Sequence, residues 1–221
     1  MYDKIIFRNI NFSLADKFGI DIWEAIGIAN LHPRVKILNP GPGVGGHCIS
    51  VDPWFLVESA PEIARLIRTS REVNDAQPHF VVELVKRALG TLKDKKIAAL
   101  GLAYKPDVDD LRESPAVEVA RLLHNAGAFV KAFEPFKPDA TFADFNTVPT
   151  LAEALKDVDA VLLLVSHAQF KTVTPEQLAS LTSARVIVDT VNVWSPKEWG
   201  AAGFALTRLG VNPHPQIQNK E

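Results

Sequence analysis

Short apolar segments alternate with polar, helix-like stretches in the second half of the chain. The segments are Ile97–Ala103, Phe129–Phe133, Ala160–Val165 and Val186–Val188. Short apolar runs are typical of strands covered on both faces, and separating helices are typical of a parallel sheet. The pattern therefore predicts a Rossmann-like α/β domain over residues 95–211.

The first crossover of this sheet has clear helix signals. Ser114 is a suitable N-cap, Pro115 suits the first helical position, and Gly127 can end the helix. An apolar stripe lies between them at Val119, Leu122 and Leu123.

The first half of the chain has helical spacing instead. Asp21–Asn30 predicts one helix. A second helical stretch is expected to begin at Ser59, as its N-cap, and to run toward Leu92, with Pro78 dividing it. These signals predict a helical region over residues 1–94, and the polar tail 212–221 is expected to fray.

Composition narrows the class of protein. Apolar residues make up 47% and charged residues 23%, which are ordinary values for a globular protein. The longest apolar run, Ala160–Val165, is too short to cross a bilayer, and the N-terminus does not resemble a signal peptide. A net charge of −2 without a basic block argues against nucleic-acid binding. We expect a cytoplasmic protein that binds neither membranes nor nucleic acids.

The single cysteine, Cys48, excludes an intrachain disulfide framework and a multi-cysteine zinc site. The six histidines do not have metal-ligand spacing, so we expect no metal site.

A glycine-rich loop surrounds Cys48. Gly41, Gly43 and Gly46 match the G-x-G-x-x-G dinucleotide fingerprint, which requires a strand before it and a long helix after it. Pro40 and Pro53 are expected to interrupt both, so the loop does not predict a dinucleotide site. Glycine could instead let a small substrate approach the backbone beside Cys48.

Cys48 is either a nucleophile or a buried, inert thiol, and spacing alone leaves the two readings equal. Neighbouring cations that could favour a thiolate are His47, Arg34 and Lys36. Asp52 would share a helical face with Cys48 if a helix begins there, and its carboxylate could position a water.

The segment Gly101–Pro115 lies at the carboxyl end of the first predicted strand, where open α/β sheets bind ligands. Lys105 and Arg112 could add positive charge beside the next helix, which suggests a phosphate-bearing ligand. The alternative is a solvated loop whose aspartates face water.

The two segments together, PGPGVGGHCISVDPWFL and GLAYKPDVDDLRESPA, resemble the UDP-glucose/GDP-mannose dehydrogenase family. The resemblance implies a central helical, dimer-forming region followed by a Rossmann-like UDP-binding domain. It also implies two hydride transfers to NAD, which oxidise the sugar C6 hydroxyl to a carboxylate. The NAD would be bound by a domain that this chain does not contain.

The resemblance also assigns roles to individual residues. Cys48 would hold the intermediate as a thiohemiacetal and then a thioester, and Asp52 would assist the hydrolysing water. Arg34 would reach the substrate of the dimer partner, and Lys105 and Arg112 would contact the UDP-sugar. The loop Leu38–Gly46 would line the sugar pocket, with its glycines at Gly41, Gly43, Gly45 and Gly46.

Three functions remain open at this point. The first is part of an NAD-dependent UDP-N-acetylhexosamine 6-dehydrogenase that is inactive alone, with the loop most similar to the form that acts on UDP-N-acetyl-D-mannosamine. The second is a non-catalytic UDP-sugar-binding and dimerisation module. The third is a cysteine-dependent hydrolase that uses Cys48 and Asp52.

Overall fold

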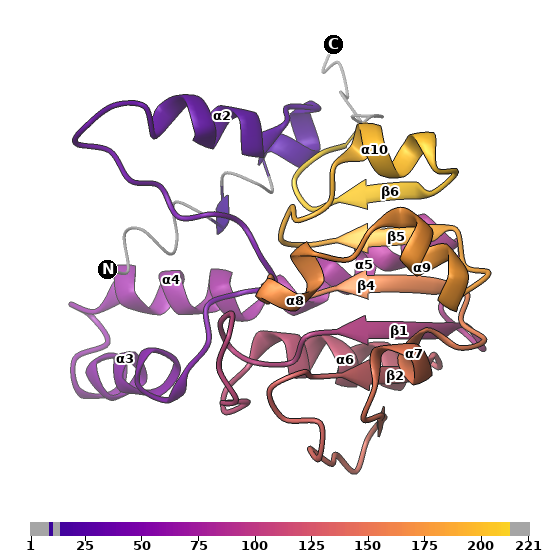
Figure 1. The fold of residues 1–221 in the computed structure, drawn as a ribbon. Helices are drawn as coiled ribbons and strands as arrows, with labels where there is room; N and C mark the ends of the chain where they lie inside the picture. The colour runs from indigo at the N-terminus through magenta and orange to yellow at the C-terminus, as the bar shows by residue number, and fades with distance from the viewer. Residues whose placement is uncertain (1–8, 11–13, 213–221) are drawn as a thin grey trace.

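The computed structural model describes residues 9–10 and 14–212, so the expected tail lies almost wholly outside the described residues (Figure 1). Its main feature is a six-stranded, all-parallel sheet in the order β3-β2-β1-β4-β5-β6. The strands are β1 Lys96–Leu100, β2 Phe129–Phe133, β3 Asn146–Thr147, β4 Ala160–Leu163, β5 Val186–Asp189 and β6 Ala205–Arg208. Together with the helices this confirms the α/β fold with a Rossmann-like parallel sheet.

Four of the strands coincide with the apolar segments of the sequence, whereas β3 and β6 were not predicted. Both are the outermost strands of the sheet. β3 has two residues, and the residues of β6 are intermediate or exposed. Strands that are this short or this accessible carry little apolar signal.

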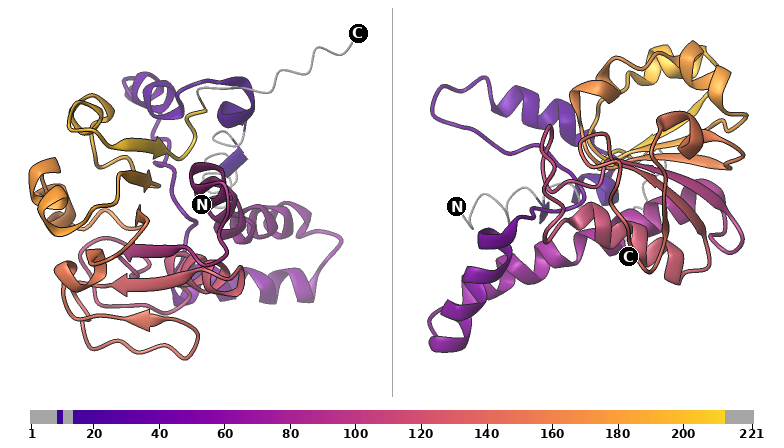
Figure 2. Two further views of the ribbon diagram at one scale, coloured as in Figure 1. Left: turned by 90° about the vertical axis from the view of Figure 1, so that its right-hand side faces the viewer. Right: turned by 60° about the horizontal axis from the view of Figure 1, so that its bottom comes forward.

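Successive side chains of strand β1 point into two hydrophobic cores, one on each face of the sheet. Ile97 and Ala99 face helices α2, α5 and α6, while Ala98 and Leu100 face α7, α9 and α10. Figure 2 shows the helices on the two sides of the sheet. The helix bounds are α2 Ile22–Ala29, α5 Gln77–Leu89, α6 Pro115–Asn125, α7 Leu151–Leu155, α8 Ala168–Lys171, α9 Pro175–Leu181 and α10 Pro196–Ala201.

Helix α6 follows its sequence signals closely. The Ser114 side chain accepts a hydrogen bond from the Ala116 amide, Pro115 is the first helical residue, and Gly127 has a φ of 89° just after the helix. This start of α6 is important because the glycine-rich loop packs onto it.

The helical region differs from the prediction in two places. Helix α3 spans His47–Ser59, so Ser59 ends a helix instead of capping a new one, and its hydroxyl donates to the Phe55 carbonyl. Pro53 lies inside α3 and does not end it. The expectation that no long helix follows the glycine loop was therefore wrong.

Helices α4, Arg65–Asp75, and α5 make up the predicted second stretch. The division falls at Ala76, and Pro78 occupies the first turn of α5, where its missing amide costs nothing. Within the described part of the chain, no helix is long and apolar enough to span a bilayer.

Candidate functional site

The switch point of the sheet lies between β1 and β4, because the strand order reverses there. Open α/β sheets bind ligands in the crevice outside the carboxyl ends of these strands. A cavity of about 250 Å³ occupies this place. Its lining comes chiefly from the loop after β1, Ala103–Pro106, the loop after β4, Leu164–Ser166, and the glycine-rich segment Pro40–Val44.

The glycines of this loop allow it to pack directly on the sheet domain. A Cβ at Gly45 would lie 2.5 Å from Cδ of Pro115 and would also overlap the Glu113 carbonyl oxygen. Gly46 has a φ of 106°, and a Cβ there would lie 3.1 Å from the Tyr104 ring. These glycines therefore serve close contact within the protein, whereas Gly41 and Gly43 line the cavity.

Cys48 follows this contact directly, as the second residue of α3, and it is exposed. Its Sγ lies 3.1 Å from Nδ1 of the adjacent His47. Asp52 is also exposed and lies one helical turn further along α3, so the two side chains share a face of the helix. The condition under which Asp52 could act beside Cys48 is thus met.

Arg112 carries positive charge that interacts electrostatically with Cys48. The Arg112 guanidinium donates two hydrogen bonds to the Asp110 carboxylate, with Nε–Oδ1 and Nη2–Oδ2 distances of 2.9 and 2.7 Å. The pKa of Arg112 is raised, mainly by this hydrogen-bonded carboxylate, with smaller electrostatic contributions from Tyr104 and Cys48. The same pair lowers the pKa of Asp110. An anionic ligand would therefore compete with Asp110 for this arginine.

Lys105 lines the cavity itself and is exposed. Its Nζ lies 5.5 Å from the centre of the Tyr104 ring. Tyr104 also lines the cavity, and its ring lies against the glycine-rich loop: a Cβ added at Gly46, two positions before Cys48, would lie 3.1 Å from the ring.

Two other residues singled out by the sequence lie apart from the cavity. Leu38 is 37% exposed and is not among the residues that line it. Arg34 is exposed and belongs to the loop after α2, which projects away from the sheet (Figures 1 and 2). Within this chain the structure does not bring Arg34 to Cys48.

A buried carboxylate that the sequence analysis missed holds the loop after β1. Glu134 follows β2 and is 2% exposed. Its Oε2 accepts the amides of Leu102 and Ala103 at 2.6 and 2.9 Å and lies 3.1 Å from Nε2 of His167. The Asp107 amide donates to Nδ1 of the same ring, so Nε2 carries the proton given to Glu134.

Electrostatics agree with an ionised Glu134. Burial by itself would raise its pKa, but hydrogen bonds from His167 and from backbone amides, including that of Leu102, hold the pKa below its ordinary value. A charged residue directly after a buried strand was a visible signal. Its partner, His167, was not visible because it lies 33 residues away.

The hydrogen bonds of Glu134 show whether the loop after β1 could bind the NAD that the family resemblance implies. In dinucleotide-binding folds, backbone amides after the first strand meet the diphosphate. Here Glu134 occupies the amides of Leu102 and Ala103, and the G-x-G-x-x-G of residues 41–46 follows no strand. The described residues do not fit NAD.

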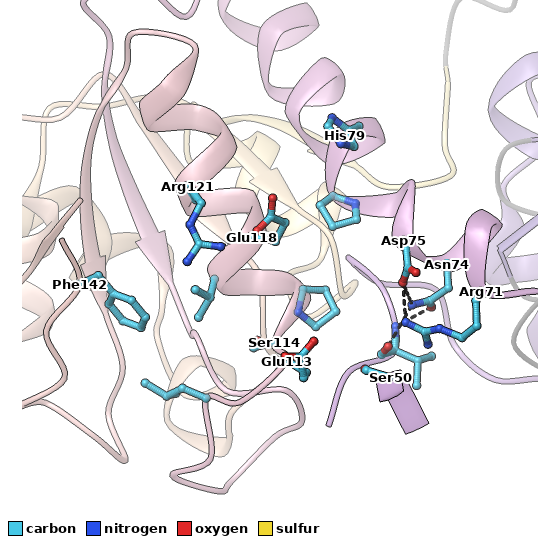
Figure 3. Close-up of a pocket in the computed structure, with 15 residues that line it drawn as sticks. Ser50, Arg71, Asn74, Asp75, His79, Glu113, Ser114, Glu118, Arg121 and Phe142 are labelled. Carbon is cyan, nitrogen blue, oxygen red and sulfur yellow. Dashed lines mark hydrogen bonds and ion pairs between the residues drawn. The ribbon is translucent and has the colours of Figure 1, made fainter. Parts of the chain in front are cut away.

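A larger cavity of about 500 Å³ lies between α4–α5 and α6 (Figure 3). One wall carries Arg71, Asn74 and Asp75, and the facing wall carries Glu118 and Arg121. Val44 and Ser50 also line it, whereas Cys48 does not. Cys48 does not line the smaller cavity either, and that cavity is the better candidate for a ligand because it lies at the switch point of the sheet and is lined by Lys105.

Comparison with known protein families finds two matches along the chain. Residues 2–76 match the model of the UDP-glucose/GDP-mannose dehydrogenase family, central domain. Residues 98–196 match the model of the same family's UDP binding domain.

Similar curated proteins include two dehydrogenases. The chain is 46% identical over 204 residues to an NDP-N-acetyl-D-galactosaminuronic acid dehydrogenase of Ralstonia solanacearum, covering 88% of this chain and 47% of that protein. It is 43% identical over 206 residues to the UDP-N-acetyl-D-mannosamine dehydrogenase of Escherichia coli, covering 85% and 48%. The chain thus spans about half the length of the curated relatives it matches.

Solved structures agree. The UDP-D-ManNAc dehydrogenase of Pyrococcus horikoshii superimposes with a TM-score of 0.83 and 32% identity, covering 96% of this chain and 50% of that one. The UDP-N-acetyl-mannosamine dehydrogenase Cap5O of Staphylococcus aureus gives a TM-score of 0.78 and 35% identity, covering 95% and 48%.

Proposed function

We propose that this chain, which belongs to the UDP-glucose/GDP-mannose dehydrogenase family, supplies the sugar-nucleotide site and the nucleophilic cysteine of a UDP-N-acetyl-D-mannosamine dehydrogenase. Members of the family are NAD-dependent UDP-sugar 6-dehydrogenases. The preference for this sugar is supported by the relatives that act on it, although relatives with another N-acetylhexosamine are equally similar.

One observation carries the proposal: Tyr104 lines the cavity at the sheet's switch point and also lies against Gly46, two residues before the exposed Cys48. The nucleotide would lie among Ala103–Pro106 and Leu164–Ser166, where Lys105 is available to a phosphate. The sugar would extend past Tyr104 toward Cys48, since Tyr104 contacts the loop residue Gly46 two positions before the thiol.

The chain's own residues would then carry the covalent part of the chemistry. The Cys48 sulfur would add to the C6 carbonyl carbon of the oxidised sugar to give a thiohemiacetal, and the positive charge of Arg112, which interacts electrostatically with Cys48, would favour the thiolate that adds. After the second oxidation, Asp52 would orient the water that releases the acid from the thioester. Arg34, on its projecting loop, would serve the site of a dimer partner.

A homodimer through the helical region is part of the proposal. Large apolar side chains are exposed on this region, among them Leu31, Phe55, Leu56, Ile63 and Leu66. Such a concentration of exposed apolar surface marks an interaction site.

A second candidate, a non-catalytic UDP-sugar-binding and dimerisation module, is favoured by a specific observation. The cavity and Lys105 lie within the described residues, whereas these residues do not fit NAD. The two candidates differ only in whether Cys48 reacts with the sugar when an NAD site is supplied to the chain.

Calorimetric titration of the 221-residue chain with UDP-N-acetylmannosamine tests the shared part of the proposal. We expect Lys105→Ala and Arg112→Ala to weaken binding by about tenfold to a hundredfold, as expected for lost charged hydrogen bonds. Cys48→Ala should bind almost normally, and Lys197→Ala, an exposed lysine of α10, is the matched control.

Absence of binding, or binding that neither cation affects, would refute the assignment. Titration with the N-acetylglucosamine and N-acetylgalactosamine analogues tests the sugar. We expect no sustained NADH formation when the chain is incubated with UDP-N-acetylmannosamine and NAD, because hydride transfer requires a held nicotinamide. Steady turnover would contradict this expectation.

A further inference from the structure

Helix α4 buries a polar face. Ser70, Arg71 and Asn74 are at most 3% exposed, whereas Leu66 on the same helix is 61% exposed. Surface helices normally bury their apolar stripe, and buried polar groups need hydrogen-bond partners. Arg71 and Asn74 both donate to the segment that carries Cys48. Each also has a partner elsewhere: Arg71 pairs with Asp75, and Asn74 Oδ1 accepts from Asn9 Nδ2 at 3.2 Å.

Asn74 holds the chain before the cysteine. The Val44 amide donates to Asn74 Oδ1 at 2.8 Å, and Asn74 Nδ2 donates to the Val44 carbonyl at 3.0 Å. Figure 3 shows this side chain beside Arg71 and Asp75 on the wall formed by α4. The two bonds fix both backbone groups of one residue, four positions ahead of Cys48.

Arg71 holds the chain after the cysteine. Pro53 lacks an amide hydrogen, so the Ile49 carbonyl, four residues earlier in α3, does not receive its helical hydrogen bond. Nη1 of Arg71 donates to this carbonyl at 3.3 Å. Nη2 pairs with Asp75, which fixes the direction of the guanidinium.

We propose that Asn74 and Arg71 are positioning residues that fix Cys48 from both sides, at Val44 and at Ile49. Arg71 replaces the amide that Pro53 cannot supply, which allows the cysteine-bearing helix to continue through a proline. The inference rests on the proposed function in taking Cys48 as the reacting thiol.

The test uses the only cysteine of the chain as a probe. Cys48 is labelled with bromotrifluoroacetone and observed by fluorine NMR, while circular dichroism monitors the fold. We expect Asn74→Ala and Arg71→Met to move the resonance toward that of the urea-unfolded chain. Ser70→Ala is the matched control, because Ser70 is equally buried on α4 but donates only to Leu66 of its own helix.

Rescue separates positioning from general structural support. Pro53→Ala restores an amide that can reach the Ile49 carbonyl, so Arg71→Met should become nearly silent in the Pro53→Ala background. The inference is overturned if Arg71→Met shifts the resonance equally in both backgrounds. It is also overturned if Ser70→Ala shifts the resonance as much as Asn74→Ala does.

A second measurement links positioning to the ligand. In unlabelled protein, we expect Asn74→Ala to weaken UDP-N-acetylmannosamine binding roughly tenfold, because Val44 borders the cavity. If the wild-type chain does not bind this ligand, the proposed function fails, but the NMR comparison still decides the role of Asn74 and Arg71. If it binds and Asn74→Ala binds equally well, the link from position to ligand is overturned.

Discussion

Replacing Gly45 by alanine tests whether contact between the glycine loop and the sheet domain organises the site. The added methyl group would meet Cδ of Pro115 at 2.5 Å and the Glu113 carbonyl, whereas ordinary van der Waals contact begins at 3.4 Å. Neither neighbour can rotate away, since one is a proline ring and the other is backbone. The loop would have to retreat by roughly 1 Å.

The cost follows from the contacts that this retreat disturbs. Overpacking typically costs about 1–3 kcal/mol, and the hydrogen bond from the Gly46 amide to the Glu113 carbonyl contributes about 1 kcal/mol more. We therefore expect Gly45→Ala to lower the free energy of unfolding by about 2–4 kcal/mol. For a chain of this size that corresponds to a decrease in Tm of roughly 4–16 °C.

Differential scanning calorimetry and urea unfolding measure this loss, and UDP-N-acetylmannosamine titration measures its effect on the cavity. The matched control is Gly27→Ala in α2, where an added Cβ would meet no atom within 4 Å. That substitution should stabilise the chain by about 0.5–1 kcal/mol through helix propensity. A Gly45→Ala variant as stable as wild type, with unchanged ligand affinity, would refute the reasoning.

Three further predictions concern the sheet domain. Since ionised Glu134 has a lowered pKa, its stabilisation is present above the unfolded pKa and is lost as the pH falls through the folded pKa; Glu134→Gln should therefore show a shallower loss of stability in urea unfolding between pH 5.5 and about 3. The pKa of Asp189 is shifted in the opposite direction: burial outweighs the backbone hydrogen bonds that its carboxylate accepts, and so raises its pKa. Its contribution is present below the unfolded pKa and is lost as the pH rises through the folded pKa, so Asp189→Asn should gain stability relative to wild type with rising pH, and a falling difference would contradict this. Phe170, which is fully buried between Phe133 and His167, should lose about 3–5 kcal/mol on substitution by alanine, measured by the same unfolding assay.

The sequence was sufficient for elements whose signals are local. The cap and proline at Ser114–Pro115 located α6, and continuous apolar runs located four strands. Prediction from the sequence failed where a hydrogen bond from a residue distant in the chain takes the place of a local helical one. Pro53 is a helix breaker by its own chemistry, and it is tolerated within α3, where Arg71 from another helix reaches the free carbonyl.

The candidate site divides in the same way. Cys48, the glycines and Lys105 were recognisable because their spacing and residue types are contiguous in the chain. Glu134 and His167 were not, since their meeting depends on β2 and β4 both lying beside β1. The burial of Asn74 could not be predicted from hydrophobic periodicity, because helix α4 buries its polar face.

Helix α2 joins residues that are nearly two hundred positions apart. The Trp23 indole donates to the Leu209 carbonyl at 2.8 Å, and Asp21 pairs at 2.7 Å with Arg208, the last residue of β6. Helix α5 lies across the same core as β1. Cleaving the polypeptide between α5 and β1 would therefore expose part of this shared core on both fragments. We expect the two regions to fold cooperatively as one unit, and the separated fragments to aggregate.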